Sequence, residues 1–361
     1  MAADFPTLWM VVGWIVFAID GSRVDVPRTR ANEQWYSPKS KLSRKAQKRR
    51  RQRRRRRAQR RGAEQAARKA NVPRIWLTVL WHVGLGLPWD WQTGPSDSSE
   101  RVHLQAMLST LPKNALIVAD AGFVGYGLWN TILNSGRHLL IRVGSNVRLL
   151  KKLGYTHEGA QTVYLWPDAA ANKGLAPLVL RLIVLRKKGH NMYLLTDIHD
   201  RRQLSDAQAA EIYRRRWGIE LFYRHCKQTF ERRKLRSHNP QNALVELEWS
   251  LMGLWAMGLH SHYYLTQRNV PPERISFAGL LRAYRRPMRE YKSTPDAGER
   301  LTELLNRARI DTYVRKNKAS RDYPRKKQEQ PPSPPIILQA TPQQTKQAQA
   351  IKNTLKLRLT A

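Results

Sequence analysis

Short apolar runs bounded by turn residues constrain the fold of this chain more than any other feature of its sequence. They are five to eight residues long and rich in β-branched and aromatic side chains, a composition typical of buried strands. The runs lie at 14–19, 75–82, 85–91, 115–119, 139–143 and 192–196, and helical patterns lie between or after them at 98–111, 121–133, 206–230 and 243–265. Strands that alternate with helices in this way predict an α/β fold with a mixed sheet.

The order of these elements is more specific than their number. The order matches a ribonuclease H-like mixed sheet with flanking helices: three strands, a helix, a strand ending at Asp120, a helix, a strand and an acid-bearing helix. A β-rich insertion occupies 144–192, before the acid-bearing helix. We therefore expect a lead-in (1–13), a core domain (14–265) containing an arginine-rich inserted loop (41–70), a helical C-terminal extension (266–315) and a disordered basic tail (316–361) rich in Lys, Gln and Pro.

The chain is strongly basic. Lys and Arg number 65 against 27 Asp and Glu, and the formal net charge of +38 predicts a polyanionic partner. Between 41 and 61, 14 of 21 residues are Lys or Arg, and such a block repels itself unless counter-charges neutralise it. Two interpretations of this block stay open, namely salt-dependent, non-specific affinity for DNA and a low-complexity expansion tolerated in a loop.

Two further features concern the compartment. Cys226 is the single cysteine, which excludes an internal disulfide and a multi-cysteine zinc site and fits a reducing cytosol. The apolar run Leu8–Ile19 is too short to span a bilayer and follows Asp4 rather than a basic start. We interpret this run as containing a buried strand, with a membrane anchor or signal peptide as the less favoured alternative.

One predicted helix carries Tyr213, Arg216, Glu220 and Lys227. At about 100° per residue, their spacing places the four side chains within an arc of roughly 60° on one face. A single carboxylate among cations suits a site where a metal ion and phosphate groups meet. The alternative is a surface helix with i, i+4 ion pairs such as Arg216–Glu220.

Two more carboxylates, Asp20 and Asp120, directly follow predicted strands, where side chains emerge at the rim of a sheet. Acids that converge at such a rim usually hold a cation, and oxygen ligands without His or Cys favour Mg²⁺ or Mn²⁺. Two such ions would activate a water or a 3′-hydroxyl and stabilise the leaving oxygen. Asp is also a common turn former, and Asp197 follows a strand as directly as Asp120 does. Asp97 and Glu100 instead suit the start of a helix.

Three segments combine into a specific pattern: FAIDGS at 17–22, IVADAGFVGYGLW at 117–129 and the Tyr-Arg-Glu-Lys row at 213–227. Together they resemble the insertion-sequence transposases of the IS-four type, in the DDE superfamily, over about 14–265 with a gap at the arginine block. The resemblance implies that Asp20, Asp120 and Glu220 form a catalytic, metal-binding triad, and it sets Asp197 aside.

The same resemblance implies roles for four other side chains. Tyr213, Arg216 and Lys227 would hold phosphates near the terminal nucleotide of the transposon, in agreement with the way Arg and Lys bind phosphate. Relatives stack a flipped base on a Trp in the β-rich insertion, and Trp166 is the candidate because it is the only Trp there.

The implied activity is metal-dependent cleavage and transfer of DNA strands at insertion-sequence ends. We expect two Mg²⁺ or Mn²⁺ ions, transposon-end and target DNA as partners, a homodimer on paired ends, no membrane association, and action in the prokaryotic cytosol at the nucleoid. Only 19 residues precede Asp20, where family members usually carry an end-reading domain. The alternatives are therefore a truncated, catalytically silent remnant that binds DNA non-specifically, and a basic RNA- or ribosome-binding protein.

Overall fold

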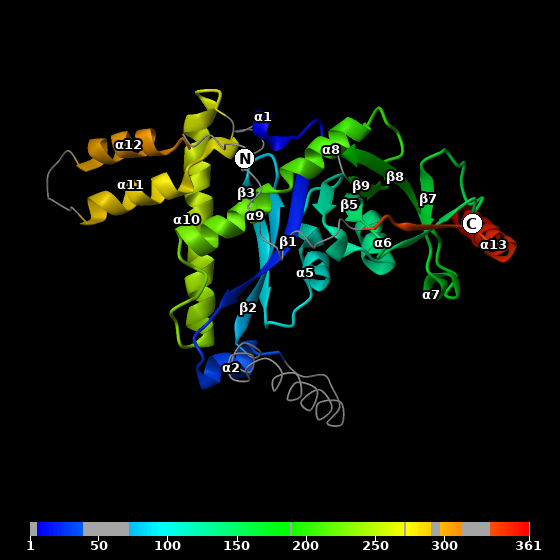
Figure 1. The fold of residues 1–361 in the computed structure, drawn as a ribbon, viewed down its shortest axis with the longest axis horizontal. Helices are drawn as coiled ribbons and strands as arrows, with labels where there is room; N and C mark the ends of the chain where they lie inside the picture. Colours follow the sequence, from blue (N-terminus) through cyan, green and yellow to red (C-terminus); the bar gives the residue numbers. More distant parts are fainter. Residues whose placement is uncertain are drawn as a thin grey trace.

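A mixed sheet of ten strands forms the centre of the described part of the chain (Figure 1). The computed structural model describes residues 6–38, 72–187, 190–270, 272–289, 297–311 and 333–360. The strands lie in the order β10-β6-β7-β8-β9-β5-β4-β1-β2-β3. Their bounds are β1 (Val16–Asp25), β2 (Arg74–His82), β3 (Leu87–Gly94), β4 (Leu116–Ala119), β5 (His138–Val143), β6 (Arg148–Lys151), β7 (Thr162–Leu165), β8 (Leu178–Lys187), β9 (His190–Thr196) and β10 (Ile336–Gln339).

The middle of this sheet is buried on both faces. β1 pairs antiparallel with β2 and parallel with β4, and β4 pairs parallel with β5. Along β1, Val16 and Ala18 pack into the core on one face, while Phe17 and Ile19 pack into the core on the other. A strand buried on both faces reads as a continuous apolar run, which is why the sequence pattern located it.

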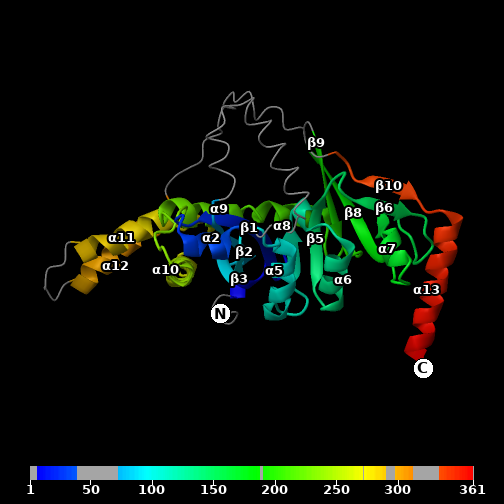
Figure 2. The same ribbon diagram turned by 90° about the horizontal axis from the view of Figure 1, so that it is seen from below.

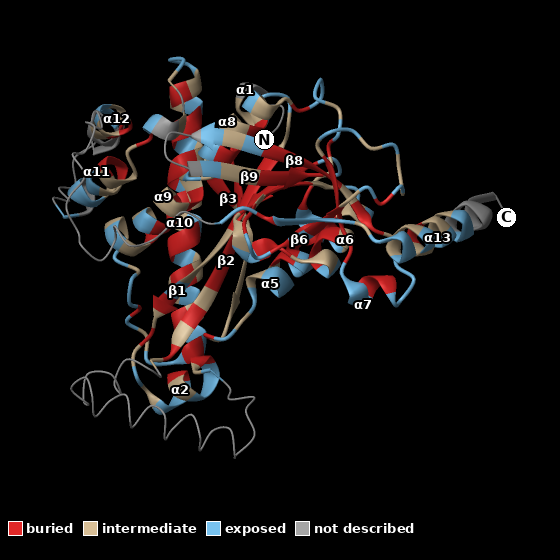
Figure 3. Cartoon of the chain, turned by 45° about the vertical axis from the view of Figure 1, so that its right-hand side comes forward, coloured by how far each residue is buried: buried red, intermediate tan, exposed pale blue. Residues whose placement is uncertain are grey.

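Helices cover both faces of the sheet (Figure 2). Side chains of α8, α9 and α10 pack into the core on one face, and those of α5 and α6 pack into the core on the other. The buried residues are concentrated in the central strands and along parts of these helices (Figure 3). The α-helices are α1 (Pro6–Trp9), α2 (Arg30–Tyr36), α5 (Glu100–Met107), α6 (Tyr126–Asn134), α7 (Asp168–Ala171), α8 (Asp206–Arg215), α9 (Gly218–Arg224), α10 (Pro240–Thr266), α11 (Phe277–Arg289), α12 (Ala297–Ala308) and α13 (Pro342–Thr360). This architecture confirms the predicted α/β fold class, a ribonuclease H-like mixed sheet with flanking helices.

Beyond β5 the sheet continues into the segment predicted as a β-rich insertion. β9 pairs antiparallel with β5, β8 with β9, and β7 with β8. At the end of the sheet β10 pairs parallel with β6, and Ala348 of α13 packs into a small core beside the insertion. The expectation of disorder over 316–361 is therefore wrong for 333–360, because the apolar run Ile336–Leu338 supplies a strand to the edge of the sheet. The arginine-rich loop predicted at 41–70 lies outside the described residues.

The apolar run near the start of the chain is divided between several elements. It spans α1, an antiparallel bridge between Val11 and Trp14, and the first residues of β1. In the described ranges, no helix combines the length and the apolar character that crossing a membrane requires.

The helix predicted over 206–230 is interrupted. α8 ends at Arg215, α9 begins at Gly218, and a π-helical turn, η3 (His225–Thr229), follows α9. Gly218 lies against the indole of Trp81 in β2, where a β-carbon would be 1.8 Å from Cη2 of the ring. This close approach of α9 to the sheet requires glycine and gives a packing reason for the break.

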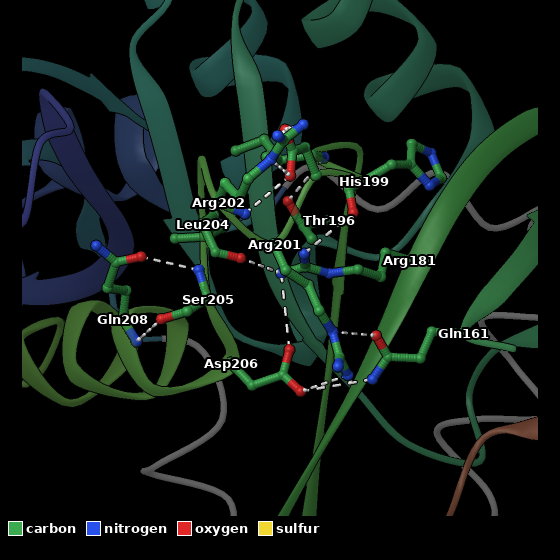
Figure 4. A network of polar contacts seen from close by, with 12 residues as sticks. Gln161, Arg181, Thr196, His199, Arg201, Arg202, Leu204, Ser205, Asp206 and Gln208 are labelled. Atoms are coloured by element: carbon green, nitrogen blue, oxygen red, sulfur yellow. Dashed lines mark hydrogen bonds and ion pairs between the residues drawn. The ribbon is translucent and has the colours of Figure 1, made fainter. Parts of the chain in front are cut away.

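A buried arginine fixes the start of α8 against the sheet (Figure 4). Arg181 of β8 is 2% exposed, and its guanidinium donates hydrogen bonds to the carbonyl oxygens of Leu204 at 2.6 Å and His199 at 3.3 Å. It also lies 3.8 Å from the Asp206 carboxylate at the first residue of α8. Ser205 and Gln208 close a capping box at the same helix end. These contacts place α8, and hence the residues that follow it, relative to the sheet.

We predict that Arg181→Met lowers the free energy of unfolding by about 2–4 kcal/mol, because two carbonyl oxygens lose buried, charge-assisted hydrogen bonds. The measurement is urea unfolding followed by circular dichroism. Arg201→Met is the matched control, since Arg201 contacts the same Asp206 carboxylate but is 64% exposed. It should change stability by less than about 1 kcal/mol, and equal effects of the two variants would contradict the prediction.

Candidate active site

Asp20 and Asp120 lie on neighbouring parallel strands. The β1–β4 pairing ends at Ala18 and Val118, and Asp120 follows the last residue of β4. Asp20 is not at the end of its strand as predicted, because β1 continues to Asp25 by pairing with β2. It lies instead just past the point where β4 stops, so both carboxylates are placed at the same opening of the sheet.

Backbone amides orient both aspartates. Asp20 Oδ1 accepts a hydrogen bond from the Gly21 N–H at 2.9 Å, and Asp120 Oδ1 accepts one from the Gly122 N–H at 2.8 Å. Asp120 thereby caps a short 3₁₀ helix, η2 (Ala121–Phe123). Gly122 lies in this short helix, whereas Gly21 lies within β1, where a β-carbon would collide with the Glu100 side chain.

Glu220 reaches the same region from the helix layer. α9 is tied to β1 by the Tyr223 hydroxyl, which donates to the Asp20 carbonyl oxygen at 2.7 Å. Arg216 donates to Glu220 Oε1 at 2.9 Å. Among the described residues, Glu220 Oε2 and Arg216 Nε are buried without a hydrogen-bond partner. One oxygen and one N–H of this pair are therefore not used by any hydrogen bond in the described part of the chain.

Glu220 and Asp120 lie close enough to Asp20 for their charges to act on its carboxyl group. Burial raises the pKa of Asp20 to about 6, and the negative charges of Glu220 and Asp120 act in the same direction. The pKa of Arg216 is also raised: burial opposes this shift, but Tyr213, Glu220 and Asp20 favour the cation. Within the described ranges no three His, Cys, Asp or Glu side chains lie near enough to hold an ion as they stand.

Three of the four side chains in the Tyr-Arg-Glu-Lys row lie together, and the fourth, Lys227, lies apart from them. The Arg216 guanidinium lies over the ring of Tyr213, with Cζ 5.3 Å from the ring centre, and pairs with Glu220. Lys227 lies in the π-helical turn η3 and points to β1, where its Nζ donates to Ser22 Oγ at 2.5 Å. Since Ser22 is two residues from Asp20, Lys227 reaches the site from the side of the sheet.

A fourth carboxylate approaches the site from the other helix layer. Glu100 is the first residue of α5, as its sequence position suggested, but it also faces β1: a β-carbon on Gly21 would lie 2.4 Å from Glu100 Oε1. Burial, together with the charges of Asp20 and Asp120, raises the pKa of Glu100 to about 7. No local pattern distinguishes Glu100 from an ordinary helix-start acid, so only the tertiary structure could reveal this contact.

A basic hollow adjoins Asp20. Its volume is about 460 Å³, and it is lined by Gly21, Ser22, Arg23, Asp25, Arg74, Trp76, Lys227 and Arg233. The guanidinium of Arg23 lies over the ring of Trp76 at 4.4 Å, and Arg74 pairs with Asp25 at 2.7 Å. The hollow thus contains four cations and one acid, a balance of charge that would attract a phosphate backbone to the side of Asp20. The sequence analysis predicted Lys227 as a phosphate ligand but missed Arg23 and Arg74, which come from the separate strands β1 and β2.

Other predicted or rival residues lie elsewhere. Asp197 accepts hydrogen bonds from the Leu139 N–H and contacts His138 Nδ1 at 2.6 Å, at the start of β5 and so at the opposite end of the strand from the triad. Trp166 is 4% exposed and donates to the Leu175 carbonyl oxygen. Its buried ring gives no support to base stacking, which stays a prediction. Cys226 is buried, and burial raises the pKa of its thiol to about 11, consistent with packing.

Fold and site together define a class of protein: a ribonuclease H-like domain whose central parallel strands and helix layer bring three acids together beside a basic hollow. The chain belongs to the family described as transposase DDE domain, which its sequence matches over residues 15–255. This membership confirms the resemblance inferred from the three sequence segments.

Two curated relatives and one solved structure are similar to this chain. The transposase InsG for insertion sequence element IS4 of Escherichia coli (strain K12) is 30% identical over 168 residues, 44% of this chain and 37% of the relative. The putative transposase y4zB of Sinorhizobium fredii (strain NBRC 101917 / NGR234) is 29% identical over 150 residues, 38% of this chain and 40% of the relative. The piggyBac transposase synaptic complex with hairpin DNA gives a TM-score of 0.42 at 11% identity, covering 87% of this chain and 62% of that one. The matches thus span well under half of the curated relatives.

We predict that Glu100→Gln stabilises the protein in EDTA at high pH. A carboxyl whose pKa rises from 4.5 to about 7 on folding binds more protons in the native state, so its charge destabilises the fold increasingly as pH rises through that window. Because Glu100 is partly exposed, we expect a gain on the order of 1–2 kcal/mol at pH 8 that shrinks as pH falls toward 4.5.

The measurement is urea unfolding of the parent and variant across this pH range. Asp97→Asn is the control, since Asp97 is an exposed acid three residues earlier. Its effect should stay below about 0.5 kcal/mol throughout. A Glu100→Gln gain that does not depend on pH would contradict the electrostatic explanation.

Proposed function

We propose that this protein is a DNA transposase that cleaves and joins strands at insertion-sequence ends by metal-dependent phosphoryl transfer. The observation that carries the proposal is that Asp20, Asp120 and Glu220 come from three separate elements, with Asp120 and Glu220 near enough for their charges to raise the pKa of Asp20. Acids that meet without a packing reason, one of them with a raised pKa, are typical of functional sites. Their convergence favours an enzyme over the silent, DNA-binding remnant and over an RNA-binding protein.

The chemistry of the triad side chains suits a pair of Mg²⁺ or Mn²⁺ ions, which would draw the three carboxylates closer together than they lie now. All the triad side chains are hard oxygen donors, and Glu220 keeps one buried oxygen without a hydrogen-bond partner among the described residues. Asp20, Asp120 and Glu220 would hold the ions, with substrate phosphates completing the coordination. Bound there, the metal supplies activation of the attacking oxygen and stabilisation of the leaving one.

The protein groups have separate tasks in this reaction. In the first step a water oxygen forms a bond to phosphorus at the transposon boundary, the bond from phosphorus to the 3′-oxygen breaks, and the freed 3′-oxygen takes up a proton. In the joining step that 3′-hydroxyl attacks a phosphodiester of the target and releases another 3′-hydroxyl. Arg216 would orient Glu220 through its hydrogen bond to Oε1, while Lys227 and the basic hollow would hold phosphates beside Asp20.

The same proposal covers the partners and the setting. Transposon-end and target DNA would occupy the basic face that carries Arg23, Arg233 and Lys227, as the net charge of +38 also favours. Joining two ends requires two active sites, so we include a homodimer on paired ends. The reaction would take place in the prokaryotic cytosol at the nucleoid.

Glu220→Gln tests the catalytic assignment. With Mg²⁺ or Mn²⁺ the parent protein should nick supercoiled plasmid, and the variant should be slower by on the order of 100-fold or more, because an amide is a poor ligand for a hard cation. Gln keeps the length of the side chain and an oxygen that can accept from Arg216. The readout is conversion of supercoiled to open-circular plasmid on a gel, with EDTA as the metal-free reference.

Glu211→Gln is the matched control for this assay. Glu211 lies in α8 and pairs with Arg214 and Arg215 on the helix surface, away from the triad. It should nick at nearly the parent rate. Equal nicking by the parent and Glu220→Gln would sink the catalytic assignment, and DNA binding without nicking by the parent would favour the remnant.

The basic hollow makes a separate prediction about salt. If Arg23 and Arg233 each neutralise one phosphate, the Arg23→Ala/Arg233→Ala variant should reduce the slope of log K against log salt by about 2 for duplex DNA. Fluorescence anisotropy with a labelled duplex at several salt concentrations measures this slope. Arg202→Ala serves as the control, because Arg202 is exposed beside Asp200 and away from the hollow. An unchanged slope in the double variant would remove the hollow from the DNA path.

A further inference from the structure

Helix α10 carries two apolar stripes, of which only one faces the core. Its inner stripe, including Ala243, Leu247, Leu251 and Leu254, packs against the sheet with α8 and α9. The outer stripe consists of Val245, Trp249, Met252, Ala256 and Tyr263, while Leu259 packs against Leu85 and Leu87. Trp249 and Tyr263 are 68% and 67% exposed, and Val245 and Met252 are each 49% exposed. A helix that is apolar all round is normally covered all round.

The spacing of the outer stripe is that of a helix–helix seam. Successive members lie four, three, four and seven residues apart, a spacing that keeps the row facing a partner helix along its whole length. The 27 residues of α10 extend over about 40 Å, long enough for several turns of contact. Single exposed apolar residues need no explanation, but a continuous row at this spacing does.

A groove runs beside the outer stripe. It lies between α10 and the edge strand β3, has a volume of about 550 Å³, and is lined by Pro88, Trp89, Trp91, Trp249, Met252, Gly253, Trp255 and Ala256. Four of these residues are tryptophans, the side chain most often found at the energetic centre of protein interfaces. Stripe and groove thus form one continuous apolar surface.

Charge selects the kind of partner. No Lys or Arg occurs between 237 and 267, although the chain has 65 among its 361 residues, and none occurs in β3. A surface without cations does not attract a polyanion, so DNA is a poor occupant. Two copies of a chain with a net charge of +38 repel each other over most of their surface, and this region is where that repulsion is weakest.

We propose that the outer stripe is the surface through which two copies of this chain pair, with the two α10 helices antiparallel about a two-fold axis. One surface that is both apolar and periodic can bind its own copy, which is the requirement of a two-fold interface. The antiparallel arrangement brings the half of α10 that holds Glu248 toward the end followed by Arg268. The inference adds a contact surface to the pairing proposed above and thus rests in part on that proposal.

The test is sedimentation velocity of the full chain over a range of protein concentrations, without DNA or metal, in about 0.3 M salt to screen the net charge. The parent should sediment increasingly as a dimer. Trp249→Glu and, separately, Met252→Lys should raise the dimer dissociation constant at least about tenfold, because each places a charge in the seam. Far-UV circular dichroism establishes whether each variant stays folded. Two variants of opposite charge are used so that the test still stands if one of them does not fold.

Trp35→Glu is the matched control, since Trp35 is 60% exposed on α2 and does not belong to the outer stripe. It should dimerise like the parent. A parent that stays monomeric, or stripe variants that dimerise as well as the control, would overturn the proposal. So would variants that keep the dimer but bind single-stranded DNA more weakly, because the tryptophans would then be a stacking surface. Since no DNA or metal enters the sedimentation experiment, its failure is distinguishable from a failure of the nicking assay.

Discussion

The repulsion between like-charged carboxylates at one opening of the sheet is the constraint on which the rest of this structure depends. Asp20, Asp120 and Glu220 would lie further apart if only their own charges acted, and burial adds to the cost, as the raised pKa of Asp20 indicates. Strand pairing, helix packing and the Arg216 cation hold them where they are. Neutral residues would be more stable in these positions, so their acidity points to chemistry rather than to folding.

Contacts far from the carboxylates set their positions. The Arg181 network fixes the start of α8, the close approach of Gly218 to Trp81 sets the path of α9, and the Tyr223 hydroxyl ties α9 to β1 at Asp20 itself. These three points lie on one continuous path from the β-rich insertion to the site. A change at Arg181 should therefore affect the position of Glu220 as well as the stability of the protein, although Arg181 itself contacts His199, Leu204 and Asp206 and not the triad.

Much of the fold could be predicted because its signals are local. Central strands such as β1 and β4 are buried on both faces and therefore read as unbroken apolar runs. Three kinds of feature could not be predicted. The interruption of the helix after Arg215 follows from packing against Trp81, the strand β10 follows from pairing with β6, and the approach of Glu100 to Gly21 follows from the docking of α5. Each depends on a partner distant in the chain.

The sequence by itself determined the fold class, the family resemblance and the identity of the candidate acids, because strand periodicity, strand ends and the Tyr-Arg-Glu-Lys spacing are properties of short segments. Only the tertiary structure decided which acids meet. Asp197 and Asp120 are equivalent as residues that follow strands, but β9 runs antiparallel to β5 while β4 runs parallel to β1, so the two aspartates emerge at opposite ends of the sheet. Strand direction is a property of the assembled sheet, and it places Asp120 with Asp20 and leaves Asp197 with His138.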